Sequence, residues 1–288
     1  MGIVAMGWVL GIAGALVLIA FLYWQLIIAE GAYMGRKVVA LLYDWSAHIY
    51  DRIKQYDTGY ETYFLARPLT SALFSFPNPL ILDVATGTAR LARTVMQEVG
   101  FRGRLIGVDI SRRMLAQAAL KTKRYGDRVT LVWDDASQLA FPDDTFEVVA
   151  CLEALEFMPD PDQVLGEMVR VLRPGGILMM TNRIGNDARL MPGRTQSSEA
   201  LYTKLQDLAL EMIQIRPWQE DYDLVWALKP GVCTPLPVRR LADVLLCPVC
   251  KGDVALESED GASGAYRCGN GHVIPVGDDG IVDVMRAR

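Results

Sequence analysis

Hydrophobic residues are distributed unevenly along this chain. The segment from Gly2 to Ala29 contains no charged residue, and a helix of about 20 apolar residues is long enough to cross a bilayer. Residues 36–75 instead carry apolar positions such as Val39 and Trp45 at helical spacing, mixed with charged residues. The pattern therefore predicts a transmembrane helix within residues 1–30, followed by a group of amphipathic helices.

A cleaved signal peptide would also be apolar and N-terminal. The run here is longer than the apolar core of a signal peptide, which has about 7 to 15 residues. No Lys or Arg precedes the run, and no clear small-x-small cleavage site follows it. The basic residues come after it, at Arg36, Lys37, Arg52 and Lys54. Because positive charge favours the inner side, we expect a single-pass protein of the cell membrane with its catalytic domain in the cytoplasm.

Small residues recur four positions apart within the apolar segment, at Gly7, Gly11 and Ala15. A stripe of this kind lets a second helix approach closely, so one interpretation is a homodimer through this face. Scattered small residues are also ordinary in a membrane span. The pattern alone leaves these two interpretations open.

From Leu80 to about Lys229, β-type apolar runs alternate with helical patterns. Five candidate strands are LILDVA, RLIGVDI, VTLVWDDA, FEVVACLEA and GILMMTN, with helices expected around 90–98, 112–121 and 161–172. A further helix near 199–210 precedes two closing strands, EMIQIRPW and DLVWALK. This alternation predicts an α/β fold, a doubly wound Rossmann-like sheet that is largely parallel.

The length of 288 residues accommodates one such domain and a smaller unit. We divide the chain into a transmembrane helix (1–30), an α/β domain with its entrance helices (36–230), a proline-containing linker (231–240) and a compact tail (241–288). The net charge is −5 and the pI is near 5.2. Nucleic-acid binding is disfavoured by this acidic balance, because phosphate contacts need a basic face.

The stretch ILDVATGTAR, residues 81–90, passes from a strand through small residues into a helix and is typical of a nucleotide-binding loop. Asp109 closes the second strand, where a carboxylate can accept hydrogen bonds from both ribose hydroxyls. That position would also suit NAD. The third strand ends in Asp135 and Ala136, which could read the amine and ring of an adenine. Ala89 replaces the second loop glycine, a change that matters less for a ligand without a pyrophosphate.

Four motifs in this order, ILDVATGTARLA, IGVDISRRMLAQA, VWDDASQLAFPDDTFEVVACLEALEFMPDP and EMVRVLRPGGILMMTN, resemble those of class I S-adenosylmethionine-dependent methyltransferases. The branch that they resemble most includes the ubiquinone/menaquinone biosynthesis C-methyltransferases. The resemblance implies that S-adenosylmethionine is the cofactor. It also implies the following contacts: the methionine end with Asp83, Ala85 and Gly87, the ribose with Asp109, the adenine face with Ile110 and Met114, and its edge with Asp135 and Ala136. AHIYDRI resembles an N-terminal element of the family in which Tyr50 would close over the cofactor.

The end of the fourth strand bears on the acceptor. Related enzymes that methylate amino or amide nitrogen carry an Asn/Asp-Pro-Pro-aromatic motif there, whereas this chain has CLEALEF. Glu153 within that stretch could orient the acceptor or take a proton, or it could simply be a carboxylate favoured by a helix N-terminus. His48 and Tyr50 are further candidates for a catalytic role. Positioning alone could also suffice, so the catalytic residue stays open.

The tail contains two short metal-binding patterns, Cys247-x2-Cys250 and Cys268-x3-His272. Two such knuckles suit a tetrahedral Cys3His zinc site, and a redox-active Cys-x-x-Cys pair is the alternative. Of the five cysteines, Cys151 and Cys233 remain, as an expected core residue and a linker thiol. The tail, from LADVLLCPVCKG to IPVGDDGIVDVM, resembles the zinc ribbons that activate tRNA and rRNA methyltransferases.

Three functions are compatible with these observations. The first is a membrane-anchored methyltransferase acting on a small apolar acceptor such as a quinone, an isoprenoid or a lipid, which would partition into the membrane. The second is an RNA methyltransferase that uses its ribbon on RNA or a partner, against which the acidic balance argues. The third is a non-catalytic scaffold with a methyltransferase fold, against which the intact cofactor motifs argue. We expect the first.

Overall fold

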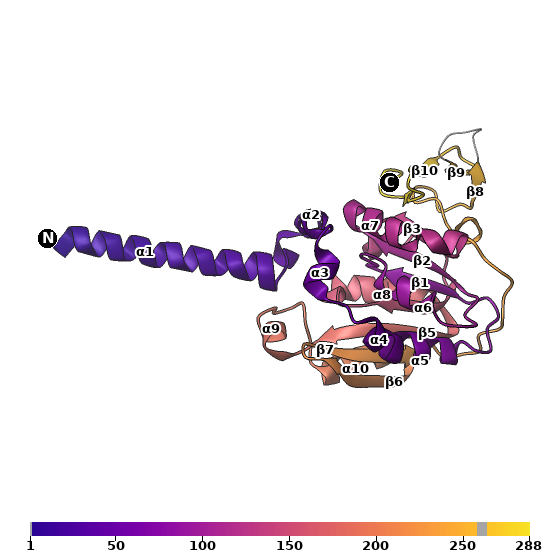
Figure 1. The fold of residues 1–288 in the computed structure, drawn as a ribbon, viewed down its shortest axis with the longest axis horizontal. Coiled ribbons are helices and arrows are strands. Elements are labelled where there is room, and N and C mark those ends of the chain that lie inside the picture. Colours follow the sequence, from indigo (N-terminus) through magenta and orange to yellow (C-terminus); the bar gives the residue numbers. More distant parts are fainter. Residues whose placement is uncertain (1, 258–263) are drawn as a thin grey trace.

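The computed structural model describes residues 2–257 and 264–288. Helix α1 (Gly2–Tyr23) projects away from the globular part of the molecule and continues into a π-helical turn, Trp24–Ile28 (Figure 1). Its apolar side chains are exposed, among them Trp8 and Leu16. Residues Trp8–Ile28 are long and apolar enough to cross a membrane. The predicted apolar helix is therefore present, and its exposure leaves it available to a lipid phase.

The predicted helices of residues 36–75 are confirmed and lie between α1 and the sheet. They are a 3-10 turn (Ala32–Met34), α2 (Arg36–Ser46), α3 (Tyr50–Lys54), α4 (Thr58–Glu61), a π-helical turn (Thr62–Ala66) and α5 (Arg67–Ala72). The segment after α1 packs onto the globular part: Ala29 and Ala32 are buried against Phe157 and Met191. The Trp24 indole also donates a hydrogen bond of 2.8 Å to the Leu190 carbonyl. The base of the apolar helix is thus attached directly to the domain.

An eight-stranded sheet forms the centre of the molecule, in the order β11-β3-β2-β1-β4-β5-β7-β6. Its first five strands are β1 (Leu80–Val84), β2 (Arg104–Asp109), β3 (Val129–Trp133), β4 (Phe146–Cys151) and β5 (Leu172–Arg183), which pair in parallel. Two antiparallel strands close one edge, β6 (Glu211–Gln219) and β7 (Tyr222–Leu228). The predicted doubly wound α/β sheet is confirmed, although β5 begins before the predicted GILMMTN.

Helices cover both faces of this sheet (Figure 1). The helices after β1 are α6 (Arg90–Val95), α7 (Arg112–Thr122), α8 (Pro161–Val171), α9 (Gly185–Arg189) and α10 (Ser198–Asp207), of which α9 lies at the end of the molecule near α1 and buries no residue. The 3-10 segments are Lys123–Arg128, Ala136–Gln138, Leu155–Phe157 and Leu241–Asp243. Alternate residues of β1 enter different cores: Leu82 packs with residues of α8 and α10, and Ile81 with residues of α5 and α6. All five residues of β1 are buried, as expected for a parallel strand covered on both sides.

The tail forms a small sheet of its own and also adds one strand to the large sheet. Strands β8 (Val254–Glu257), β9 (Ala265–Cys268) and β10 (Val273–Pro275) form an antiparallel sheet in the order β10-β9-β8. The chain then returns, and β11 (Val282–Asp283) pairs in parallel with β3, Val282 opposite Val132. Figure 1 shows the yellow C-terminal segment over this edge of the sheet. Residues 241–288 were expected to be a unit of their own, but they contribute a strand to the α/β domain.

Candidate functional site

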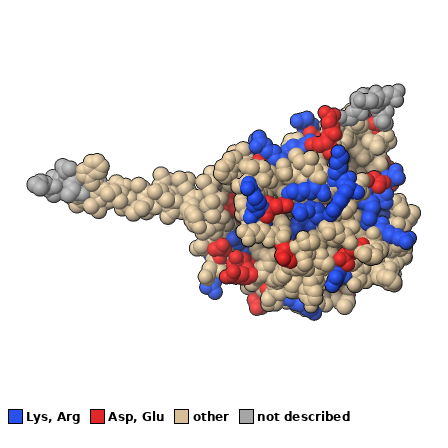
Figure 2. Space-filling model, viewed as in Figure 1, with Lys and Arg blue, Asp and Glu red and all other residues tan. Residues whose placement is uncertain are grey.

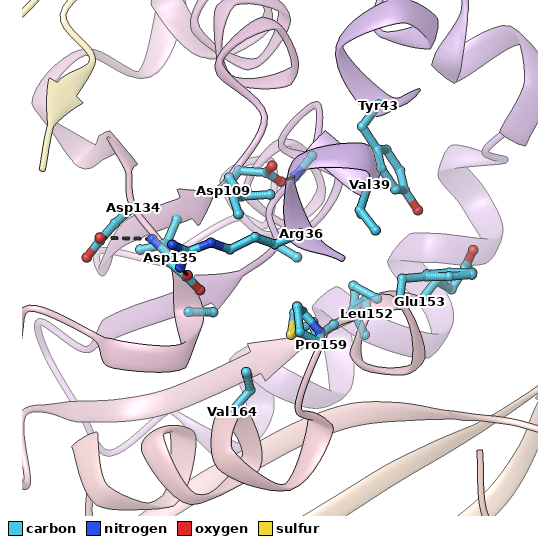
Figure 3. Close-up of a pocket in the computed structure, with 18 of the residues that line it drawn as sticks. Arg36, Val39, Tyr43, Asp109, Asp134, Asp135, Leu152, Glu153, Pro159 and Val164 are labelled. Carbon is cyan, nitrogen blue, oxygen red and sulfur yellow. Dashed lines mark hydrogen bonds and ion pairs between the residues drawn. The ribbon is translucent and has the colours of Figure 1, made fainter. Parts of the chain in front are cut away.

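A cavity opens at the carboxyl ends of β1 to β4 (Figure 3). Ligands of open α/β sheets bind at this edge, where the strand order reverses, and here it reverses between β1 and β4. The lining includes eight residues predicted from the sequence: Tyr50, Ala85, Gly87, Asp109, Ile110, Asp135, Ala136 and Glu153. The fold therefore brings residues from five separate stretches of chain to one cavity.

The loop after β1 turns through left-handed backbone. Ala85, Gly87 and Ala89 have φ values of 56°, 55° and 65°, and such values are unfavourable for the two alanines because of their Cβ atoms. The Gly87 N–H donates a 2.8 Å hydrogen bond to Asp109 Oδ2. This hydrogen bond connects the loop after β1 to the end of β2, two segments that line the cavity.

Asp109 is buried, and backbone groups hold its carboxylate. In addition to the bond from Gly87, Oδ1 accepts a 2.8 Å hydrogen bond from the Ser111 N–H. Burial raises the pKa of Asp109 to about 6, and the hydrogen bonds from Ser111 and Gly87 oppose this rise. Each carboxylate oxygen has a second lone pair, so the group can still accept bonds from a ligand in the cavity.

Asp83 lies deeper, at a smaller cavity lined also by Tyr50, Ala85 and Gly87. Its Oδ2 accepts a 2.6 Å hydrogen bond from the Thr86 hydroxyl. Burial raises the pKa of Asp83 to about 7; the Thr86 hydrogen bond opposes this rise and the charge of Asp109 adds to it.

Arg36 reaches the cavity from α2 and pairs with Asp135 (Figure 3). Burial would raise the pKa of Asp135, but hydrogen bonds from Ser137 and the Arg36 guanidinium hold it below its usual range. Because Arg36 and Asp135 are 99 positions apart in the chain, no local pattern indicated this contact. Helix α2, which follows the apolar helix in the chain, thus contributes directly to the wall of the cavity.

Glu153 is part of a buried chain of charges. Its Oε1 accepts a 2.5 Å hydrogen bond from Arg90, and its Oε2 one of 2.9 Å from Lys54. Arg90 also pairs with Glu61 through two bonds, of 2.8 and 2.5 Å. Burial would raise the pKa of Glu153, but Lys54 and Arg90 outweigh it and lower the pKa.

This arrangement argues against Glu153 as a proton acceptor and leaves a role in orienting the acceptor as a prediction. The carboxylate is engaged by two cations rather than by a helix N-terminus, and the lowered pKa makes it a poor proton acceptor. Sequence reasoning missed Lys54 and Arg90. Arg90 could have been recognised as a site residue, because it is a charged residue directly after a loop of small residues. No local feature of the sequence indicated Lys54.

Two other predicted residues lie away from the cavity. His48 is exposed and does not line it, so the structure gives this side chain no place near a reacting atom. Met114 is buried, but it also lies outside the cavity lining. Its amide donates to the Ser111 hydroxyl, which caps α7. Of the residues expected at the adenine face, only Ile110 lines the cavity.

A second candidate site lies in the tail. One side-chain atom of each of Cys247, Cys250, Cys268 and His272 lies within 4.8 Å of the others. The Cys250 and Cys268 sulfurs are 3.6 Å apart, and His272 Nδ1 is 3.3 Å from the Cys268 sulfur. A tetrahedral zinc with Zn–S bonds of about 2.3 Å requires sulfurs about 3.8 Å apart, so the four groups fit zinc.

The thiol chemistry of this cluster also suits a metal. The Gly252 N–H and His272 lower the pKa of Cys250 to about 6, and a thiolate is the form that binds metal. The other two cysteines differ: Cys151 is buried in the core and Cys233 is half-buried.

Residues 81–176 match a family model described as a methyltransferase domain. The ubiquinone/menaquinone biosynthesis C-methyltransferase UbiE of Hahella chejuensis is 39% identical over 102 residues, which cover 35% of this chain and 41% of the relative. A demethylmenaquinone methyltransferase of Anoxybacillus flavithermus is 44% identical over 96 residues, 33% of this chain and 40% of the relative.

A solved structure extends the likeness to the fold. The structure of an S-adenosylmethionine-dependent methyltransferase from Aquifex aeolicus covers 61% of this chain and 95% of its own, with a TM-score of 0.50 and 18% identity. At that identity the likeness concerns the fold only. The chain spans about two fifths of the length of the two curated relatives, and the matched segment holds the loop after β1 and the ends of β2 to β4.

Proposed function

We propose that the protein transfers methyl groups from S-adenosylmethionine. The match of residues 81–176 to a methyltransferase domain supports this, as does the similarity to methyltransferases of the quinone branch. The proposed acceptor is a small apolar molecule, a quinone, isoprenoid or lipid that partitions into a membrane. The observation that carries the proposal is a single cavity. It has carboxylates at the strand ends, and α2 supplies part of its apolar wall.

The proposed cofactor contacts follow the geometry of the cavity. Asp109 would accept hydrogen bonds from the ribose hydroxyls. Asp135 and Ala136 would meet the adenine edge, and Ile110 its face. In the deeper part, Asp83, Ala85 and Gly87 would surround the methionine end, with Tyr50 above it. For Asp135 to bind an adenine amine, the Arg36 guanidinium must move or share the carboxylate, because its ion pair occupies Oδ2.

The apolar walls support the choice of acceptor. Val39 and Tyr43 of α2 and Phe157 and Met158 after β4 line the same cavity as the carboxylates. Phe157 also packs against the buried residues that follow α1. An apolar molecule that arrives along the base of α1 would therefore meet apolar surface up to the cofactor site. Burial of such a molecule is favourable by about 25 cal/mol for each Å² of apolar surface removed from water.

The bound cofactor supplies an electrophilic methyl group on sulfur. A carbon acceptor would exchange one proton, released to solvent, for the methyl group, and the electron pair of the methyl–sulfur bond would remain on the sulfur of the product. In our proposal the protein contributes mainly by holding the two reactants in line and excluding water. Glu153 lines the cavity, and its ion pair with Arg90 holds its side chain in place.

We propose zinc as the resident metal of the tail, held by the four groups Cys247, Cys250, Cys268 and His272. When bound, zinc would supply a structural crosslink rather than catalysis, because four protein ligands leave it no open position. Tyr266 and Ile274 of the tail are buried in the core that the tail shares with the α/β domain, so the metal would add folding free energy to a unit that is already packed.

RNA methylation is the second candidate, and one observation favours it. Figure 2 shows Lys and Arg side chains gathered on the face of the molecule where α6 and α7 lie in the same view. Several basic residues of this region already pair with acids: Arg93 and Lys121 with Asp51, and Arg104 with Asp127. Those pairs reduce the charge available to phosphates, and so we rank the apolar acceptor first.

The full-length protein in detergent, incubated with S-adenosylmethionine labelled in its methyl group, tests the proposal. Lipid, RNA and protein fractions of the host would be supplied separately, together with demethylmenaquinone in oxidised and reduced forms. We expect label in the lipid fraction or the quinone. Label found in RNA alone would reverse our ranking of the two acceptors. Binding of S-adenosylmethionine without methyl transfer to any fraction would favour the non-catalytic scaffold.

Deleting residues 2–22 should separate anchoring from chemistry. The deletion keeps Trp24 and the buried Ala29 and Ala32, whose contacts belong to the domain. We expect unchanged rates on detergent-dispersed acceptor. Rates on acceptor embedded in vesicles should fall at least tenfold, because tethering raises local concentration by about 10² or more. A chain with an unrelated apolar helix in place of residues 2–22 is the control, and it should restore the vesicle rate. Equal rates of the deleted and full-length proteins on vesicles would contradict the anchoring role.

Asp109→Ala should weaken cofactor binding. Loss of the carboxylate removes the proposed ribose contact and leaves polar groups unpaired, at a cost of about 1 to 3 kcal/mol. Calorimetric titration with S-adenosylhomocysteine should show this as roughly a tenfold to hundredfold higher Kd. Asp127→Ala, which removes an exposed carboxylate paired with Arg104, is the charge-matched control. An equal Kd in Asp109→Ala would remove the ribose assignment.

A further inference from the structure

The segment that follows the small sheet of the tail packs against β3, the strand that leads into the wall of the proposed cofactor cavity. Val282 and Asp283 extend the main sheet beside β3. The Val284 and Met285 amides then both donate to the Trp133 carbonyl, each at 3.1 Å. Trp133 is the last residue of β3 and directly precedes the two aspartates of the cavity wall. The tail is therefore hydrogen-bonded to the end of β3, directly before the residues of the proposed adenine contacts.

Arg288 completes this contact with an ion pair to the buried Asp134. Its guanidinium donates to Asp134 Oδ1 through Nε at 3.0 Å and Nη2 at 2.9 Å, and to Oδ2 at 3.1 Å. It also donates to the Gln138 side chain at 2.6 Å and to the Gln138 carbonyl. Asp134 is only 1% exposed. Arg288 thus joins the strand end to the 3-10 turn that follows it, on either side of Asp135 and Ala136.

Asp134 in turn organises the backbone of the cavity wall. Its Oδ1 accepts a 2.8 Å hydrogen bond from the Asp135 N–H, and its own N–H donates to the Asp109 carbonyl at 3.2 Å. Burial raises the pKa of Asp134 to about 6, and the charge of Arg288 opposes this rise. A buried carboxylate without its cation would be costly, so the orientation of this group depends on Arg288.

A second contact connects the tail to the ribose side of the cavity. Arg112, in the first turn of α7, pairs with Asp279 at 2.8 Å. This helix starts directly after Ser111, whose amide binds Asp109. The tail therefore contacts both segments, after β2 and after β3, that are proposed to hold the nucleoside.

We infer that Arg288 is a positioning residue of the cofactor site, which holds Asp134 and, through it, Asp135 and Ala136 in the orientation that receives adenine. The inference rests on the proposed cofactor contacts. It gives the tail a defined role in the methyltransferase domain: the tail shapes the nucleoside pocket of its own chain. Removal of Arg288 should weaken cofactor affinity and leave the number of binding sites and the rate at saturation unchanged.

The test is calorimetric titration of the full-length protein with S-adenosylhomocysteine, comparing wild type with Arg288→Gln. The Kd should rise about tenfold or more, since hydrogen bonds to a buried charge are lost. The stoichiometry should stay the same, and in turnover assays KM for S-adenosylmethionine should rise while kcat does not. Arg267→Gln removes an exposed arginine of the tail that pairs with Glu257; this control should leave Kd unchanged.

A double-mutant cycle with Asp134→Asn locates the effect. If Arg288 acts through Asp134, Arg288→Gln should change Kd less than about twofold when Asp134 is already replaced. Arg288→Lys keeps the charge and loses the paired donors, so it should give an intermediate Kd, and it serves in place of Arg288→Gln if that variant does not fold.

Three results would overturn the inference: an unchanged Kd, a lower stoichiometry with an unchanged Kd, or an equal effect of Arg267→Gln. Failure of the wild-type protein to bind S-adenosylhomocysteine would instead overturn the proposed function itself, and the inference with it.

Discussion

Arg90→Met should destabilise the protein by about 3 to 5 kcal/mol, the usual cost of removing one partner from a buried ion pair. Arg90 is 7% exposed and bridges Glu61 and Glu153, which are 3% and 6% exposed. Met has a similar length and no charge, so the change leaves the volume filled and the two carboxylates without their shared cation. Urea unfolding of the full chain in detergent, followed by tryptophan fluorescence, measures the loss.

Arg93→Met is the matched control for this prediction. Arg93 lies on the same helix and pairs with Asp51, but both side chains are about one third exposed. Exposed pairs contribute about 1 kcal/mol or less, so the control should lose far less stability. Similar losses in the two variants would mean that the buried charges do not hold this part of the fold.

The pH dependence of the same variant provides an independent check. In the wild type, the lowered pKa of Glu153 gives stability that is present above the ordinary value of 4.5 and lost as pH falls through the folded-state pKa. In Arg90→Met the pKa of Glu153 should rise, because a cation is gone and burial remains. The variant can then relieve its buried charge by binding a proton. The difference in unfolding free energy between the two proteins should therefore shrink from pH 8 to pH 5.

Loss of zinc should unfold the small sheet of the tail. Structural zinc contributes about 10 to 16 kcal/mol in zinc-finger peptides, and here it would add to the packing of Tyr266 and Ile274 in the core shared with the α/β domain. We expect one equivalent of zinc in protein made with sufficient zinc, and less than half an equivalent in Cys250→Ser. Metal analysis measures the content. Hydrogen exchange at the amides of β8 to β10 should accelerate at least a hundredfold in the variant.

Cys233→Ser is the control, because this half-buried cysteine lies outside the four-residue cluster. It should keep its zinc and its slow exchange. Cys250→Ser that retains full zinc, or a tail whose amides stay protected without metal, would contradict the assignment. A stable disulfide between Cys247 and Cys250 in protein purified under reducing conditions would favour the redox alternative.

The amino-acid sequence alone predicted those features whose signals are local. The apolar helix, the alternation of strands and helices, and the acids at Asp109 and Asp135 each appear within a few consecutive residues, because periodicity and strand ends are properties of short segments. The metal-binding cluster could be predicted for the same reason: its two pairs of ligands are each separated by only two or three residues.

The tertiary structure alone decided which of these segments meet. Arg36 pairs with Asp135, Lys54 with Glu153, and Arg288 with Asp134, 154 residues away. Side chains so distant in sequence carry no periodic or spacing signal for one another, and their pairing depends on how the helices and the tail pack around the sheet. The same packing leaves His48 at the surface and Met114 outside the cavity.

The two-residue strand β11 is the clearest case. VD is too short to show the alternation that identifies a strand, and the zinc-ribbon pattern before it predicted a separate unit. Its pairing depends on the open backbone edge of β3, which offers hydrogen-bonding groups that only the folded sheet creates. The sequence thus determined the elements and the chemistry of their ends, and the fold determined that the tail pairs with β3, the strand that leads into the wall of the cavity.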